Sequence, residues 1–583
     1  MHVVRDVLRI ANCSGFYGDR LAAAREMVEG GPIDVLTGDY LAELTMYLLW
    51  KARQRDPEAG YAVSFLAQMR EVLGTCLERG IKVVVNAGGL NPAGLAGKLG
   101  GLAAAAGLSP RIAYIEGDNL LGHDLIGDFP ASDGAQPVTA NAYLGGWGIA
   151  QALGAGADVV ICGRVTDASL VVGPAAWAFG WAADDWDRLA GAVAAGHIIE
   201  CGAQATGGNY AFFTELDRPV HPGFPIAELR ADGSCVITKH EGTGGAVTVD
   251  TVTAQLLYET DSPAYLNPDV VARFDTVRLT SDGPDRVLVS GTRGEPAPET
   301  LKVCLNYPGG HRNSATFMLT GLDIEAKAAF AEAALLDATG GPARFAAYET
   351  RLERWNDTAA RLTLTVKDPD PHKVGRAFFT TVVGTGLSGY PGLYLEHFSP
   401  KAEEYGVYRH TLVPADAVPA EAVLPDGERL AVLRPSSPPR PPVIPAQPSP
   451  APQDGPFAGP FAGPFAGPTV RAPLGRLIGA RSGDKGGDAN VGLWARTDDA
   501  YAWLRDSLDV AMLRELLPEA AKLSVSRYEL PNLRALNFVV HGLLGEGVAS
   551  STRPDPQAKS LGEFLRARSV EIPATLLSAV KAR

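Results

Sequence analysis

The segment AAGHIIECGAQATGGN places three reactive side chains close together. His197, Glu200 and Cys201 are spaced at i, i+3 and i+4, so they share one face if a helix continues that far. A histidine beside an acid is suited to general acid–base catalysis, and a histidine beside a cysteine can activate a thiolate nucleophile. Packing in a hydrophobic core is the third interpretation. One histidine and one glutamate are too few ligands for a metal site, so we predict no metal.

Two further segments, CGRVTD and NAGGLNPAG, favour anion binding. Arg164 follows an apolar run and can bind a phosphate or carboxylate through two hydrogen bonds, or else form an internal ion pair with Asp167. The glycines of NAGGLNPAG lie between a predicted strand and a predicted helix, where they either present N–H groups to an anion or form only a tight turn. Neither segment is a Walker A motif or a GxGxxG fingerprint, so no nicotinamide, flavin or other cofactor is expected.

Two polar loops later in the chain are also candidates for substrate binding. KHEGTGGAV offers Lys239 beside flexible backbone. RSGDKGGDANVG has two aspartates at a spacing that suits a hard cation, but the lysine between them disfavours cation binding. The segment has more glycines and charges than a solvated turn needs, which favours a functional loop. The candidate residues of this second loop are Asp484, Lys485, Asp488 and Asn490.

One local pattern, repeated along residues 1–200, predicts how the first group of loops is positioned. A short apolar run rich in β-branched residues is followed by a Gly/Asp/Asn turn and then by a helical stretch rich in alanine or leucine. The runs lack period-two alternation, so we expect an α/β fold whose parallel sheet has helices on both faces. The expected strands are Val7–Ala11, Ile33–Thr37, Ile81–Val85, Arg111–Ile115 and Ala157–Ile161.

Loops that follow parallel strands meet at the carboxyl edge of the sheet, where ligands bind. We therefore expect one site there, with Asp19, Asp39 or Asp167 sharing proton transfer with His197 and Glu200. The remaining turn residues are expected to bind substrate: Ser14, Gly15, Asn86, Gly88, Gly89, Asn91, Asp118, Asn119 and Arg164.

Composition divides the chain into four parts. Residues 1–205 form the predicted parallel α/β domain, and residues 206–433 read as an α+β second part or an elaboration of the first, with hairpins near Asp232-Gly233 and Asp282-Gly283 and helices over 323–338 and 343–355. Residues 434–468 are rich in proline and end in a GPFA repeat, which predicts a spacer or a PxxP-type ligand. Residues 469–583 are expected to form a small α+β domain.

Charge and cysteine content narrow the class of protein. The 583 residues carry a net charge of −14 with no basic stripe, which argues against nucleic acid and anionic membranes as partners. Six cysteines without a CxxC pair predict neither a disulfide scaffold nor a zinc site. No apolar segment is typical of a signal peptide or a membrane span, so a cytoplasmic protein is expected.

Many motifs in a fixed order resemble the acyclic terpene utilization protein A family over about residues 7 to 433. These are GFYGD, DVLTGDYLAE, NAGGLNP, AYLGGWGI, ADVVICGRVTDASL, GHIIECG, GGN, GFPIAE and LLYE. RSGDKGGDANVG resembles the small ferredoxin-fold domain that accompanies this family, so the C-terminal domain is expected to be ferredoxin-like. The proline-rich linker is not part of the family pattern. The resemblance implies a role in degrading citronellol- and geraniol-type compounds as coenzyme A thioesters.

These observations together predict an enzyme that acts without a cofactor on a branched or unsaturated acyl-CoA or carboxylic acid, in terpenoid or branched-acid catabolism. Addition or elimination, as in a hydratase or lyase, is the expected reaction. Two alternatives are a thioester hydrolase, using Cys201 or an activated water, and a non-catalytic binding or scaffold subunit. The expected partners are the small-molecule substrate and further copies of the chain. We also expect the loop 481–490 to dock over the carboxyl edge of the sheet and close the site.

Overall fold

The computed structural model describes residues 6–126, 135–432 and 467–581. At its centre lie parallel strands in the order β1-β2-β3-β6-β4, which confirms the predicted α/β fold. Each of these strands overlaps one of the predicted apolar runs. They span β1 (Val7–Asn12), β2 (Val35–Gly38), β3 (Lys82–Val85), β6 (Val159–Cys162) and β4 (Ile112–Glu116).

Helices cover both faces of this sheet, which explains why its strands are rich in apolar residues. In β3, Val83 and Val85 pack into one hydrophobic cluster while Val84 packs into the other. The helices on the first face are α1 (Ala23–Glu29), α3 (Val63–Arg79) and α4 (Pro92–Ala105). Those on the second are α5 (Trp147–Gly154), α6 (Ser169–Phe179) and α7 (Trp186–Ile199).

Some later parts of the chain extend the same sheet. Antiparallel strands join it beside β1 and beside β4, to give eleven strands in all in the described residues. Both predicted hairpins are present as β7–β8 and β11–β12. The added strands are β7 (Pro225–Arg230), β8 (Cys235–Lys239), β11 (Arg278–Ser281), β12 (Val287–Ser290), β19 (Glu421–Val423) and β20 (Arg429–Ala431).

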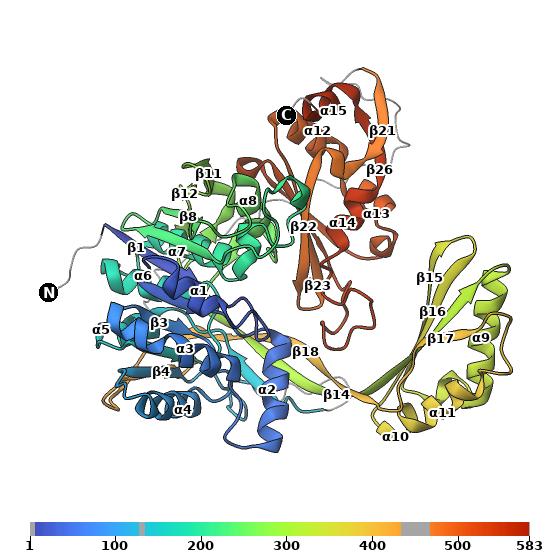
Figure 1. Cartoon of the computed structure of the whole chain (residues 1–583), viewed down its shortest axis with the longest axis horizontal. Coiled ribbons are helices and arrows are strands. Elements are labelled where there is room, and N and C mark those ends of the chain that lie inside the picture. Colours follow the sequence, from blue (N-terminus) through green and yellow to red (C-terminus); the bar gives the residue numbers. More distant parts are fainter. Residues whose placement is uncertain (1–5, 127–134, 433–466, 582–583) are drawn as a thin grey trace.

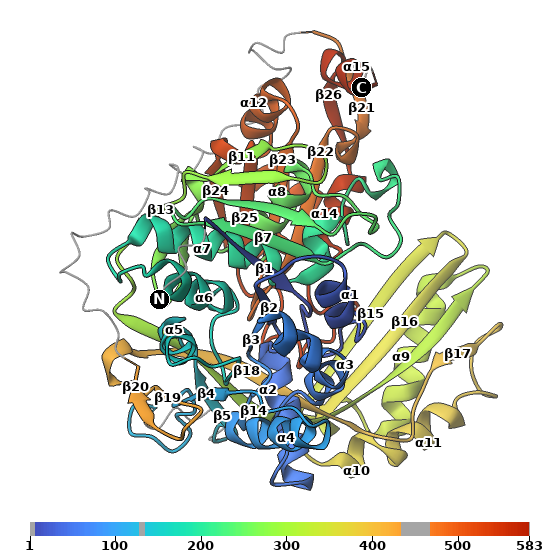
Figure 2. The same ribbon diagram turned by 60° about the vertical axis from the view of Figure 1, so that its left-hand side comes forward.

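A second sheet forms an arm that extends away from the α/β body (Figures 1 and 2). Its central strand β14 (Thr300–Thr320) pairs first with β5 (Thr139–Ala142) and β18 (Glu403–Pro414) at the body, and then with other strands in the arm. Phe317 and Leu364 belong to the separate core of this arm. The arm's other elements are β15 (Ala347–Asn356), β16 (Ala359–Asp368), β17 (Tyr394–His397), α9 (Ile324–Thr339), α10 (Pro371–Val374) and α11 (Arg376–Gly384).

The helix predicted over 343–355 is wrong, because most of that segment is strand β15. Its ten residues pair antiparallel with β16 through a short turn near Asp357. Tyr348, Thr350 and Leu352 alternate with charged residues along it. Pairing with a neighbouring strand therefore outweighs a local composition that also suits a helix. The predicted helix over 323–338 is confirmed as α9.

The C-terminal domain is the predicted α+β unit, with a sheet in the order β22-β23-β25-β24. One face of the sheet packs on the domain's own helices. The other meets the α/β body, where the side chains of Asn490 and Asn537 donate to the carbonyl oxygens of Leu257 and Thr260. The elements are β21 (Thr469–Pro473), β22 (Ile478–Lys485), β23 (Asp488–Ala495), α12 (Asp498–Ser507), α13 (Val510–Leu516), β24 (Val525–Leu530), β25 (Ala535–Val540), α14 (Leu561–Ala567), β26 (Ser569–Pro573) and α15 (Ala574–Lys581).

Nearly all of the proline-rich linker lies outside the described residues, so its predicted role as a spacer stays a prediction. Across the ranges that the structure does describe, no helix combines the length and the apolar character that a bilayer crossing requires.

Trp494 joins the C-terminal domain to the body. It is 1% exposed and packs with Tyr210 and Phe212, whose ring centroids lie 6.4 Å and 6.3 Å from its own. We expect Trp494→Ala to lower the free energy of unfolding by about 3–5 kcal/mol, as truncation of a buried tryptophan does. Urea unfolding measures the loss. Trp355→Ala is the control, because Trp355 is 58% exposed; equal destabilisation of both variants would contradict the interface role.

Candidate active site

A cavity of about 870 Å³ lies between the carboxyl edge of the parallel sheet and the C-terminal domain. The loops after β1, β2 and β6 reach it, as does the end of α7. The β22–β23 hairpin closes it from the other side, where the sequence predicted that the loop 481–490 would dock. The predicted site residues in its lining are Gly15, Asp19, Asp39, Arg164, Asp167, Glu200, Asp484, Lys485 and Asp488.

Arg164 lies in the loop after β6 and is 3% exposed. Its Nη1 atom donates to Asp167 Oδ1 at 2.8 Å and to the carbonyl oxygen of Leu41 at 3.2 Å, and its guanidinium lies 4.2 Å from the centre of the Tyr143 ring. The predicted internal ion pair is therefore present in a residue that also lines the cavity. Burial opposes the charge, but Asp167 and its neighbours outweigh burial and raise the pKa of Arg164. The cavity thus has a fixed cation.

Asp118 holds the loop that carries Arg164, without lining the cavity itself. Its Oδ2 accepts hydrogen bonds from the backbone N–H of Arg164 at 2.9 Å and from Asn141 Nδ2 at 2.8 Å. Burial raises the pKa of Asp118 to about 6, in spite of these donors. Asp118 is therefore a positioning residue.

Glu200 follows the last turn of α7 and is 8% exposed. Its Oε1 lies 3.1 Å from His197 Nδ1, while Oε2 has no hydrogen-bond partner among the described residues. Burial, with Asp167 and Glu259 nearby, raises the pKa of Glu200 well above its ordinary value. Burial and Lys485 lower the pKa of His197 to about 4. Burial therefore favours the neutral form of both the histidine and the carboxyl group.

His197 itself does not line the cavity. It is 1% exposed and packs against the rings of Tyr265 and Phe274, at centroid distances of 4.9 Å and 5.3 Å. Its contact with the cavity runs through Glu200. This geometry makes His197 a positioning residue and leaves Glu200 as the group that lines the cavity.

Five other acids of the cavity show two kinds of pKa shift. Burial raises the pKa of Asp39, Asp167, Glu259 and Asp484. Burial alone would also raise the pKa of Glu43, but Lys302 and Arg164 outweigh it and lower the value to about 2. Pairs of acids whose environments separate their pKa values are typical of sites that both donate and accept protons.

The C-terminal domain holds Glu259 by both of its backbone polar groups. Asn490 Oδ1 accepts from the N–H of Glu259 at 2.8 Å, and Lys485 Nζ donates to its carbonyl oxygen at 2.8 Å. Glu259 has a φ of 54°, a left-handed conformation that is uncommon for a residue other than glycine. Asp261 and Glu259 raise the pKa of Lys485 although burial opposes its charge. Lys485 is thus a second fixed cation in the cavity.

The NAGGLNPAG loop forms a tight turn, and none of its residues is in the cavity lining that the described residues form. Asn91 Oδ1 caps α4 by accepting from the N–H of Gly94. A Cβ atom on Gly88 would lie 2.5 Å from the carbonyl oxygen of Cys162, and Gly89 has a φ of 52°. Asn86 Nδ2 donates to Asp39 Oδ1. The loop supports Asp39, and its N–H groups are not presented to the cavity.

Three other predicted substrate-binding residues also lie outside this cavity lining and have structural contacts. Ser14 Oγ donates to the carbonyl oxygen of Phe16, and Asn119 Oδ1 accepts from the N–H of Leu121. Lys239 pairs with Asp285 at 3.0 Å, on the wall of a different pocket.

Cys201 lines the cavity, but its environment disfavours a thiolate. Burial, with Glu259 and Glu200 nearby, raises the pKa of the Cys201 thiol well above its ordinary value. Since the thiolate is the nucleophile, the predicted alternative of a cysteine hydrolase has little support.

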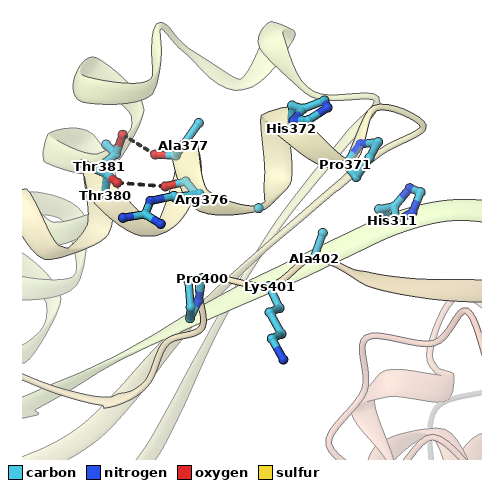
Figure 3. A pocket seen from close by; sticks show the side chains of 11 residues that line it. His311, Pro371, His372, Arg376, Ala377, Thr380, Thr381, Pro400, Lys401 and Ala402 are labelled. Atoms are coloured by element: carbon cyan, nitrogen blue, oxygen red, sulfur yellow. Dashed lines mark hydrogen bonds between the residues drawn. The ribbon is translucent and has the colours of Figure 1, made fainter.

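An open pocket of about 910 Å³ lies on the arm, remote in sequence from the predicted site residues (Figure 3). His311 of β14, His372 of α10, Arg376 of α11 and Lys401 border it. His311 Nδ1 lies 3.1 Å from the carbonyl oxygen of Pro369. None of the acids that the sequence singled out borders this pocket, so we place the candidate active site in the inter-domain cavity.

The fold and this site define a two-domain α/β protein whose small domain completes a buried, carboxylate-rich cavity. Residues 8–424 match the model of the acyclic terpene utilisation family protein AtuA, and residues 472–571 match the AtuA ferredoxin-like domain. The chain belongs to the AtuA family, as its motifs indicated. No curated protein and no solved structure matched the chain.

Replacement of Arg164 tests how far the site depends on its buried ion pair. We expect Arg164→Ala to destabilise the fold by about 3–5 kcal/mol, because Asp167 loses its partner and Leu41 its donor. Substrate binding should weaken as well. Thermal unfolding and ligand titration measure the two effects. Arg25→Ala is the control, since Arg25 is exposed; an Arg164→Ala protein with unchanged stability would contradict the structural part of this role.

Proposed function

We propose that the protein is an enzyme that adds water to, or eliminates it from, a branched or unsaturated acyl-CoA thioester or a related carboxylic acid. The observation that carries this proposal is Glu200, a buried acid with a raised pKa in an inter-domain cavity that also contains Arg164 and Lys485. A carboxyl group that keeps its proton at neutral pH is suited to act as a general acid.

In the hydration direction, the cations polarise the substrate carbonyl and the acids move the protons. Arg164 and Lys485 bind the carbonyl or carboxylate oxygen, which takes up negative charge as the reaction proceeds. A water molecule adds its oxygen to the β-carbon and gives a proton to an ionised acid. The candidates are Glu43, whose pKa is lowered, and Asp167, which forms an ion pair with Arg164. Glu200 gives its proton to the α-carbon. Elimination is the reverse, and no electrons are gained or lost.

The charge of the cavity limits which part of the substrate enters it. Carboxyl groups outnumber lysines and arginines in its lining, so few cationic partners are available to the phosphates of coenzyme A in the interior. We place the acyl chain and the thioester inside and the nucleotide at the mouth. The acids are Asp19, Asp39, Glu43, Asp167, Glu200, Glu259, Asp261, Asp484 and Asp488, and the lysines and arginines are Arg164, Lys302, Lys485 and Lys559.

Membership of the AtuA family supports a substrate from terpenoid or branched-acid degradation. The test is a screen of branched and unsaturated acyl-CoA thioesters and of the free acids, followed by mass spectrometry. Gain or loss of one water by a substrate would support the proposal. Release of free coenzyme A would support a hydrolase instead, and tight binding without any mass change would support a binding subunit.

A further inference from the structure

Three strands of the C-terminal domain bring a serine, a histidine and an aspartate into one row. Residue Ala489 of β23 pairs with Val540 of β25, so Asp488 lies opposite His541. Ser526 of β24 pairs with Val539, which places it diagonally across from His541 on the same face of the sheet. Strand register, not sequence proximity, therefore assembles the three residues.

The hydrogen bonds run in the order that a nucleophilic serine requires. His541 Nδ1 lies 2.8 Å from Asp488 Oδ2, and His541 Nε2 lies 2.9 Å from Ser526 Oγ. The other oxygen of Asp488 accepts from the backbone N–H of Gly542 at 2.8 Å, which fixes the carboxylate. With Nδ1 protonated toward the aspartate, Nε2 is free to accept the serine proton.

The row is open to the inter-domain cavity and to solvent. Asp488, Val539 and His541 are part of the cavity lining. The side chains of His541 and Asp488 are 41% and 34% exposed, and Ser526 is partly buried. Ser526 is not part of that lining, but its hydroxyl lies one hydrogen bond away from His541, which is.

We propose that Ser526, His541 and Asp488 form a second reactive centre that transfers or hydrolyses acyl groups of esters or thioesters. The proposal does not rest on the proton chemistry proposed for Glu200, and it assigns hydrolysis to a serine in place of Cys201. The same three-residue arrangement supports acyl transfer on unrelated folds, where geometry and not sequence position defines it.

The reaction balances with water as the only co-reactant. Ser526 Oγ forms a bond to the carbonyl carbon while His541 Nε2 takes the hydroxyl proton. The carbon–sulfur bond of a thioester then breaks, and the leaving thiolate takes that proton from His541. Water, with its proton passing to His541, attacks the acyl-serine, and release of the acid returns the proton to Ser526.

The full-length protein is treated with a fluorophosphonate probe, and the adduct is located by peptide mass spectrometry. We expect the adduct on Ser526, and we expect Ser526→Ala to abolish it. His541→Asn should lower both the labelling rate and the hydrolysis of a p-nitrophenyl ester by at least about 100-fold. Ser524→Ala is the matched control, since Ser524 is exposed two residues away, and it should behave as the unmodified protein.

An unmodified protein without an adduct on Ser526 would overturn the proposal, as would labelling that His541→Asn leaves unchanged. Mapping the adduct in the unmodified protein keeps the test decisive even if Ser526→Ala fails to fold. The probe reacts without the natural substrate. The labelling result therefore does not depend on whether Glu200 acts as a general acid. Equally, a failure to label Ser526 would not contradict the role proposed for Glu200.

Discussion

Replacement of Glu200 by glutamine is expected to lower turnover by about 100- to 10,000-fold, the usual contribution of a general acid. Glutamine keeps the size of the side chain and a hydrogen-bonding oxygen for His197 Nδ1, but it has no proton to give. Substrate affinity should change much less than the turnover rate, because the cations Arg164 and Lys485 remain in place. Steady-state kinetics with the substrate from the acyl-CoA screen separates the two parameters.

The pH dependence follows from the same residue. The pKa of Glu200 is raised well above its ordinary value of 4.5, so the reactive protonated form persists to higher pH than in an exposed glutamate. Activity should fall as the pH rises through that raised pKa, because the carboxyl group then ionises. Glu29→Gln, at an exposed acid on α1, is the control and should keep the full rate. A Glu200→Gln protein with an unchanged rate would refute the assignment of the general acid.

Replacement of Lys485 by methionine is expected to weaken substrate binding by about 10- to 100-fold, which is the loss of one hydrogen bond to a charged group. Lys485 comes from the C-terminal domain, so this change tests whether that domain completes the site. Lys485 also lowers the pKa of Glu200, and its removal should move the high-pH limb of the activity profile to higher pH. A purely structural lysine would not move that limb.

Lys522→Met is the matched control, because Lys522 is an exposed lysine of the same domain. Calorimetric titration with a non-reactive acyl-CoA thioether, run beside urea unfolding, separates lost affinity from lost stability. Full affinity and an unshifted pH profile in Lys485→Met would show that the C-terminal domain is only tethered to the body.

The central sheet could be predicted from the sequence because burial on both faces leaves continuous apolar runs such as 83–85. The arm could not be predicted in the same way. Strand β14 changes partners halfway along and passes through Pro308, Gly309 and Gly310, residues that ordinarily interrupt a strand. Strand β15 does alternate Tyr348, Thr350 and Leu352 with charged residues, but its composition also suits a helix, and its pairing with β16 decides the outcome.

The candidate site could be predicted only where its residues follow strands of the parallel sheet. Asp39 and Arg164 could be predicted because the loops that carry them both lie at the carboxyl edge of the parallel sheet. Glu43, Lys302 and Glu259 were missed. Glu43 is in the first turn of α2 (Glu43–Arg55), Lys302 is on β14, and Glu259 follows α8 (Val249–Leu257). The sequence contains one signal for Glu43, which is its place in the DVLTGDYLAE motif. Lys302 and Glu259 reach the site only through packing between segments that are distant in the sequence.

The measurement that tests the central claim most directly is the transfer of a solvent proton to carbon. The protein is incubated in D₂O with the acyl-CoA substrate, and the product is analysed by mass spectrometry. We predict one deuterium on the α-carbon of the hydrated product, and none above background with Glu200→Gln under the same conditions. Conversion that leaves the acyl carbons free of deuterium, or equal incorporation by Glu200→Gln, would contradict the account.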